Sequence, residues 1–256
     1  MIFRPLVESM TWSYSRIKTF DDCPYRFFLK YIIGVNESPM FFSSYGSFIH
    51  KLIESFYNGE VSKEDLVIKF LTGFKQNVQG DLPKRNLVEK YIKCGVDYFG
   101  SFSPFPYNAI GVEKRVDFEI EGKRFVGYID YLGEKSGEYY IVDNKSRDLK
   151  QRSNRAKPTS KDKERDEMLK QLYLYAEAVK QEFGKYPKAL CFNCFKNGTF
   201  IEEPFNENVC HDNLKWFIEK IREIEETELF PPHPDYFGCM NICGVNKGCC
   251  YYDGGE

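Results

Sequence analysis

The chain has 256 residues, of which 42% are hydrophobic and 29% charged, a composition that argues against a disordered or fibrous protein. Its 36 basic and 38 acidic side chains leave a formal net charge of −2, so any nucleic-acid surface must be a local patch. No apolar run approaches the roughly 18 residues of a membrane span. Arg4 and Glu8 fall where a signal peptide would be apolar, so we expect a protein that is neither secreted nor bound to a membrane.

The first hundred residues carry mostly helical patterns. Their apolar residues recur at three- and four-residue spacing, which is typical of amphipathic helices. Pro24 interrupts the first of these patterns, so we expect two short helices there that join at residues 22–24. The expected helical segments are 13–33, 45–58, 62–78 and 84–100.

The pattern then changes to alternating apolar and polar residues separated by short glycine-containing turns, which predicts an antiparallel meander of three strands. A helix, a strand and a long helix follow, and Pro231 ends the last helix. The strands are expected at 110–120, 123–133, 138–143 and 188–196, and the later helices at 166–183 and 206–229.

This order predicts an α/β fold with a mixed central sheet flanked by helices. We expect one integrated domain with three parts. They are a helical N-terminal lobe at 1–105, a core at 106–205, and a C-terminal helix with a cysteine-rich tail at 206–256.

Two carboxylates and a lysine occupy neighbouring strands of the predicted meander. Asp130 lies in the second strand, and Asp143 and Lys145 end the third. Adjacent antiparallel strands can bring Asp130 and Asp143 close together, where they repel unless a cation such as Mg²⁺ neutralises them. Lys145 shares the face of Asp143 because side chains alternate along a strand. The arrangement suits metal-dependent phosphodiester hydrolysis, and the alternative is a solvated strand end with an ion pair.

Five segments in order resemble the RecB-type branch of the PD-(D/E)XK nucleases, which includes CRISPR-adaptation nucleases, the AddB nuclease domain and viral exonucleases. The similar segments span residues 15–176. They are SYSRIKTFDDCPYRFFLKYI, YGSFIHKLIE, GYIDYLG, IVDNKS and QLYLYA. The resemblance implies a PD-(D/E)XK nuclease core in a cytoplasmic prokaryotic or viral protein. Its implied partners are DNA, as single strands or duplex ends, and proteins of a recombination or CRISPR-adaptation complex.

The resemblance also implies roles for particular residues. It implies that Mg²⁺ or Mn²⁺ is held by His50, Asp130, Asp143 and the backbone carbonyl of Asn144. Lys145 would be the catalytic lysine, and Gln171 and Tyr175 would contact DNA or position Lys145. Glu113 lies in the strand before Asp130, but the exposed face of an alternating strand explains it equally well, so we leave it outside the core set.

Cysteines cluster in the last 18 residues of the chain. In the iron–sulfur members of the resembled family, one cysteine of the opening segment joins three near the C-terminus. Here these would be Cys23, Cys239, Cys243 and Cys249, with Cys250 as a substitute for Cys249. They would hold a [4Fe–4S] cluster or, alternatively, a tetrahedral zinc. Cys191 and Cys194 are three apart on a strand and so face opposite sides, which predicts core thiols.

Residues 146–170 hold nine basic and five acidic residues. They form either a solvated loop or a flap that contacts phosphates, for which Arg147, Lys150, Arg152 and Arg155 are the candidates.

Two functions follow from the sequence. The first is a metal-dependent DNA exonuclease acting in recombination, repair or CRISPR adaptation. The alternative is a non-catalytic DNA-binding or assembly subunit with a nuclease fold, stapled by an iron–sulfur cluster or zinc.

Overall fold

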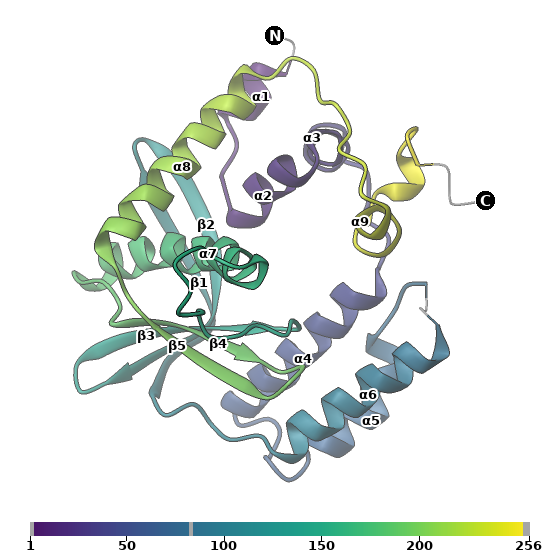
Figure 1. The fold of residues 1–256 in the computed structure, drawn as a ribbon, viewed down its shortest axis with the longest axis vertical. Coiled ribbons are helices and arrows are strands. Elements are labelled where there is room, and N and C mark those ends of the chain that lie inside the picture. The colour runs from purple at the N-terminus through teal and green to yellow at the C-terminus, as the bar shows by residue number, and fades with distance from the viewer. Residues whose placement is uncertain (1–2, 82–83, 253–256) are drawn as a thin grey trace.

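A five-stranded mixed sheet forms the centre of the computed structural model, which describes residues 3–81 and 84–252 (Figure 1). The strands lie in sequence order: β1 (Asn108–Ile120), β2 (Lys123–Lys135), β3 (Glu138–Lys145), β4 (Ala189–Cys194) and β5 (Thr199–Pro204). The first three form the predicted antiparallel meander. Strand β4 is parallel to β3, because helix α7 (Ser160–Phe183) carries the chain back between them.

The strand predicted over 188–196 is β4, and the sequence analysis missed β5, because the chain turns after Cys194 and returns as a second strand. Gly198 takes a φ of 67° in this turn, a conformation that glycine adopts easily. Strand β5 buries only Ile201. An edge strand with one buried residue shows no alternating pattern, and the sequence therefore does not reveal it.

Helices cover both faces of the sheet (Figure 1). Helices α7, α2 (Tyr14–Asp22) and α8 (Glu207–Glu226) pack on one face in the largest hydrophobic cluster. A second cluster joins α4 (Phe41–Tyr57), α5 (Leu66–Asn77) and α6 (Arg85–Gly100). Cys191 and Cys194 are buried in separate clusters, which confirms that they are core thiols. Within the two described ranges, no helix is long and apolar enough to cross a bilayer.

A segment near the N-terminus packs against a segment near the C-terminus. The N-terminal segment forms α1 (Arg4–Glu8), α3 (Pro24–Phe27) and a π-helical stretch (Phe28–Ile33), and the tail forms α9 (Tyr236–Asn241) and a 3₁₀ turn (Asn246–Gly248). In Figure 1, α9 lies next to α3. The backbone N–H of Tyr25 donates to the carbonyl of Pro231, and the rings of Tyr25 and Tyr251 are 5.0 Å apart.

Two tight hairpins set the register of the meander. The loops Glu121-Gly122 and Ser136-Gly137 each have two residues, and all four residues have positive φ, the type I′ geometry that matches strand twist. In the first hairpin, Val112 pairs with Tyr131 and Lys114 with Ile129, so Glu113 lies opposite Asp130. In the second, pairing ends at Tyr131 and Val142, one position before Asp130 and Asp143. Three carboxylates are therefore abreast on three neighbouring strands.

Helix α7 begins at Ser160, six residues before the predicted start. Asp162 explains the difference, because its carboxylate accepts hydrogen bonds from the backbone N–H and hydroxyl of both Ser153 and Thr159. These bonds complete a capping box and tie the 146–159 loop to the helix. The first turn carries charged residues without apolar periodicity, so the sequence pattern does not show it.

We expect Asp162→Ala to lower the melting temperature at pH 7 by about 2–5 °C. The hydrogen bonds lower the pKa of Asp162 below its ordinary value of 3.8. The stabilisation is therefore present above about pH 4 and is lost as the pH falls through the folded-state pKa. Thermal denaturation of both proteins in steps from pH 7 to pH 2 checks this. The prediction fails if the difference between their melting temperatures does not shrink as the pH falls below 3.8.

Candidate active site

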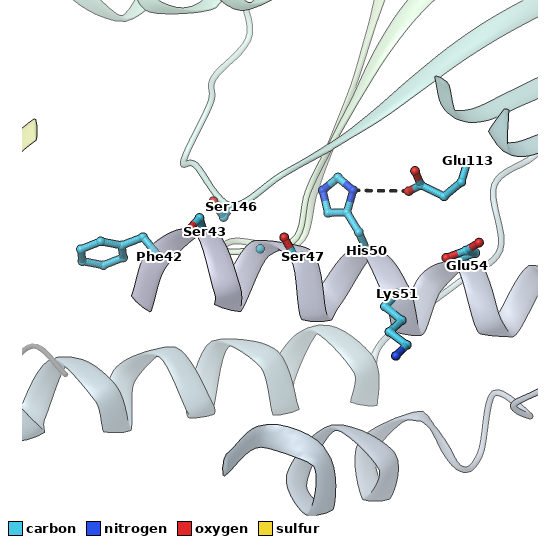
Figure 2. Close-up of a pocket in the computed structure, with 9 residues that line it drawn as sticks. Phe42, Ser43, Ser47, His50, Lys51, Glu54, Glu113 and Ser146 are labelled. Carbon is cyan, nitrogen blue, oxygen red and sulfur yellow. Dashed lines mark ion pairs between the residues drawn. The ribbon is translucent and has the colours of Figure 1, made fainter. Parts of the chain in front are cut away.

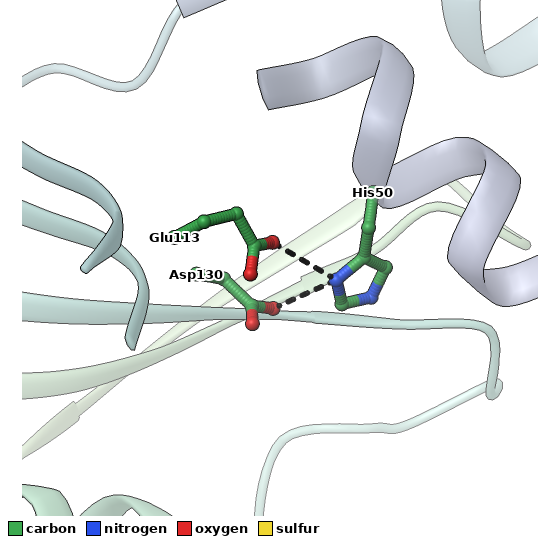
Figure 3. A group of neighbouring side chains, drawn as sticks. All are labelled: His50, Glu113 and Asp130. Atoms are coloured by element: carbon green, nitrogen blue, oxygen red, sulfur yellow. Dashed lines mark ion pairs between the residues drawn. The ribbon is translucent and has the colours of Figure 1, made fainter. Parts of the chain in front are cut away.

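The side chain of His50 projects from α4 towards the row of carboxylates (Figure 2). Its Nδ1 lies 3.3 Å from Asp130 Oδ2 and 3.6 Å from Glu113 Oε1 (Figure 3). One ligand atom from each of these three residues falls within 4.8 Å of the others. One imidazole and two carboxylates with this spacing can hold a divalent cation.

The second ring nitrogen of His50 is already engaged, since Nε2 lies 2.9 Å from the carbonyl oxygen of Asn144. Histidines that bind metals commonly donate their other N–H to a backbone carbonyl, which orients the ring. The carbonyl of Asn144 therefore contacts the histidine in this structure. The backbone N–H of the same residue donates to Asp130 Oδ2 at 2.7 Å. The backbone N–H and carbonyl of a single residue, Asn144, thus orient Asp130 and His50.

Protonation compensates the negative charge of this cluster. Burial alone would lower the pKa of His50, but the surrounding carboxylates, Asp130 above all, raise it to about 9. Burial also raises the pKa of Asp130, and although His50 opposes the shift and Asp143 adds to it, the resulting value is about 7. The imidazolium occupies the position where a cation would balance the same carboxylates, and metal binding there would release its proton.

Asp143 and Lys145 form a buried ion pair beside this group. The Lys145 ammonium is 2.7 Å from Asp143 Oδ2, and the side chain of Asp143 is only 5% exposed. Within the part of the chain that the structure describes, that oxygen accepts no hydrogen bond of normal geometry. A buried carboxylate oxygen without directed hydrogen bonds fits an oxygen-binding cation nearby.

Lys145 is held from its other side by α7. Its ammonium donates to Gln171 Oε1 at 3.0 Å, and Gln171 Nε2 donates to the hydroxyl of Tyr175 at 3.2 Å. Burial raises the pKa of Tyr175 to about 12, so its hydroxyl stays neutral. A Cβ at Gly127 would overlap the Tyr175 ring, which explains the need for glycine at that position in β2. The structure thus brings the residues predicted for metal binding and catalysis into one region.

Glu113 is the residue that the sequence analysis left out. Its φ of 45° on β1 is unusual for a residue with a side chain, and residues held in such conformations often cluster at functional sites. The two-residue hairpin after Ile120 is the sequence signal that could have found it, because that turn places Glu113 opposite Asp130.

The four cysteines Cys23, Cys239, Cys243 and Cys249 line one cavity between α3 and the tail. Cys250 lies outside this lining, with its sulfur 3.3 Å from the hydroxyl of Tyr25. Among the described residues, no three cysteine sulfurs lie within 4.8 Å of one another. A single zinc with Zn–S bonds of 2.3 Å would require sulfurs about 3.8 Å apart. In this structure the described cysteine sulfurs are therefore not as close together as a single zinc would require.

The predicted basic residues lie on the 146–159 loop. Arg147 and Arg152 pair with Glu164 and Asp166 of α7 at 3.1 and 2.9 Å, and Lys150 and Arg155 are exposed. This loop follows Lys145 directly and leads into α7, so it borders the candidate site.

The model of the PD-(D/E)XK nuclease superfamily matches residues 11–250, so the chain belongs to this superfamily. Among solved structures, a "Putative exonuclease" from Eubacterium rectale is 13% identical, with a TM-score of 0.54 and 94% of each chain covered. A second structure, SSO0001, is 14% identical with a TM-score of 0.34, covering 80% of this chain and 96% of that one. No curated protein matches the chain. The first likeness shows the same fold, which confirms the predicted nuclease core.

A polar contact behind the site leads to a prediction about metal affinity. Asn193 on β4 donates to Asn144 Oδ1 and contacts the Tyr98 hydroxyl, both at 2.7 Å. We expect Asn193→Leu to weaken Mn²⁺ binding about 10- to 100-fold, because Asn144, whose backbone N–H and carbonyl orient Asp130 and His50, loses the hydrogen bond that holds its side chain. Calorimetric titration with Mn²⁺ measures this, with Asn213→Leu on α8 as the control. Unchanged affinity in a folded Asn193→Leu protein would contradict it.

Proposed function

We propose that this protein is a metal-dependent DNA exonuclease of the RecB-type branch. The observation that carries the proposal is the cluster of His50, Glu113 and Asp130 beside the Asp143–Lys145 ion pair. A site that only binds DNA would not require a lysine held between a carboxylate and Gln171. The resemblance to known nucleases supports a role in recombination, repair or CRISPR adaptation.

The residues present fit Mg²⁺ or Mn²⁺. His50, Glu113, Asp130 and Asp143 would hold the ion, with Asn144 contributing its carbonyl either to the ion or to the orientation of His50. When bound, the ion would neutralise these carboxylates and the phosphate charge that grows during hydrolysis. The protein's own contribution is the rigid placement of these ligands by the two hairpins and α4.

Lys145 supplies the second positive charge of the site. Its ammonium is held between Asp143 and Gln171, so it is fixed in position before the substrate arrives. There it can orient the attacking water and stabilise negative charge on the phosphate. Gln171 and Tyr175 hold the Lys145 ammonium in this orientation. The basic side chains of the 146–159 loop would contact neighbouring phosphates.

We expect Lys145→Ala to reduce the release of nucleotides from end-labelled linear DNA with Mn²⁺ by about 10²- to 10³-fold, as for loss of one preorganised donor. Glu113→Gln should cause a loss of similar size by removing one ligand. Glu119→Gln, on the exposed part of the same strand, is the matched control. All variants should come from one anaerobic preparation scheme and be compared by their melting temperatures.

The outcomes separate the two functions expected from the sequence. Equal cleavage by wild type and Lys145→Ala would place the chemistry elsewhere or in a contaminant. Salt-sensitive DNA binding with no cleavage by any form would favour the non-catalytic subunit instead.

We also propose a structural [4Fe–4S] cluster bound by Cys23, Cys239, Cys243 and Cys249. The four residues converge on one cavity, and the backbone N–H of His233 donates to the sulfur of Cys23 at 3.4 Å. Burial raises the pKa of Cys243 and of Cys249, so the protein alone does not favour thiolates there. A cluster would stabilise them and join the tail to the N-terminal helices.

We expect Cys249→Ser to lose iron and inorganic sulfide on anaerobic purification, whereas Cys250→Ser keeps both. The two residues are adjacent and differ in that Cys249 lines the cavity while Cys250 faces Tyr25. Iron and sulfide per chain and the visible absorption spectrum measure the effect. Retention of iron by Cys249→Ser together with its loss from Cys250→Ser would reverse the assignment, and zinc without sulfide in the wild type would replace the cluster by a single metal.

A further inference from the structure

An open groove runs from the candidate site along one face of α4 and encloses about 550 Å³ (Figure 2). Ser43, Gly46, Ser47, His50 and Glu54 line it at helical spacing, and Glu113 and Ser146 close its other side. Phe42 and Lys51 complete the lining. Cavities of 300–1,000 Å³ hold ligands of small-molecule size. A groove of this volume can take part of a nucleotide strand that lies against α4.

Gly46 is the unusual residue of this groove. It lies inside a 17-residue helix, where glycine is among the least favourable residues. A Cβ built at Gly46 meets no atom within 4 Å, so packing against the protein does not explain the absence of a side chain. The space that a side chain would occupy belongs to the groove. The glycine is explained if another molecule approaches the helix at this point.

The end of the groove at Phe42 is aromatic. The ring of Phe42 lines the groove and lies 5.9 Å from that of Phe237 on α9. Phe237 is 55% exposed, although burial would be favourable for so large an apolar side chain. Exposed aromatic rings are the usual platform on which unpaired bases stack.

We propose that the α4 groove holds a single DNA strand, with its backbone passing against Gly46 and a base stacked on Phe42 and Phe237 while a phosphate lies at His50. This inference rests on the proposed nuclease function and adds the path and strandedness of the substrate. Residues 42 and 50 are eight apart, which is about 12 Å along a helix. A strand in duplex DNA rises about 3.4 Å per nucleotide and an unpaired strand extends further, so the stacked base lies at most about three to four nucleotides from the phosphate at His50.

The first test uses Gly46→Leu in the full-length protein with Lys145→Ala as background, so that DNA binding is measured without cleavage. The probe is a fluorescein-labelled single-stranded oligonucleotide, read by fluorescence anisotropy. We expect Gly46→Leu to weaken binding at least tenfold without lowering the melting temperature. Gly100→Leu on α6 is the matched control, because a Cβ there also meets nothing within 4 Å.

The second test uses Phe237→Ala, with Ile68→Ala on α5 as a control of equal exposure, 55% for both side chains. Loss of one stacked base corresponds to binding weaker by about 5- to 150-fold. A series of oligonucleotides with one abasic position each then locates the stacked base. At one position, the abasic site should weaken binding by the parent protein. In Phe237→Ala, the same abasic site should cause no additional loss of affinity. Phe237→Trp should bind the intact oligonucleotide as tightly as the parent does.

The proposal is overturned if the parent does not bind single strands, if Gly46→Leu and Phe237→Ala bind like the parent, or if a blunt duplex competes as well as a single strand. These results are independent of catalysis. Groove-dependent binding by a wild type that cleaves nothing would refute the nuclease function and leave the strand path intact. Cleavage that none of the groove variants affects would refute the strand path and leave the nuclease function intact.

Discussion

Three carboxylates held abreast on neighbouring strands are the electrostatic constraint around which this protein is built. The two type I′ hairpins fix Glu113, Asp130 and Asp143 in register, and like charges at that spacing repel unless they are neutralised. His50 and Lys145 approach from α4 and β3, and each contacts one or two of the three. The surrounding helices therefore do more than cover the sheet, since α4 supplies His50 and α7 supplies Gln171, which holds Lys145 of β3.

The site also shows how the sheet is modified to accept charged groups. Pairing between β2 and β3 ends at Tyr131 and Val142, and the next N–H, that of Asn144, donates to the carboxylate of Asp130. A side chain thereby takes the place of a strand carbonyl. Strand β3 meanwhile continues to pair with β4 as far as Lys145. The separation of β2 and β3 creates room for the site without leaving that backbone N–H unsatisfied.

Much of this arrangement could be predicted from the sequence because it depends on local patterns. Alternation revealed the meander, and strand periodicity placed Asp143 and Lys145 on one face. The sequence analysis left out Glu113, because its place in the site depends on the pairing of β1 with β2 and on a backbone conformation that the hydrophobic pattern does not reveal. The early start of α7 escaped because it depends on Asp162 bonding to Ser153 and Thr159 in the preceding loop. Strand β5 escaped because it buries a single residue.

The meeting of α3 and the tail has a consequence for how the chain reaches its folded state. The Cys23–His233 and Arg26–Ile242 contacts span 210 and 216 residues, so they close nearly the whole chain into a loop. The entropy of closing a flexible loop rises only slowly with its length, but it must be supplied before such distant contacts form. The N-terminal helices therefore leave the ribosome long before their partner exists, and the surface of α3 that faces the tail stays uncovered until residues 231–242 have been synthesised. Synthesis of this tail segment, rather than of any one N-terminal helix, is the event that closes this part of the molecule.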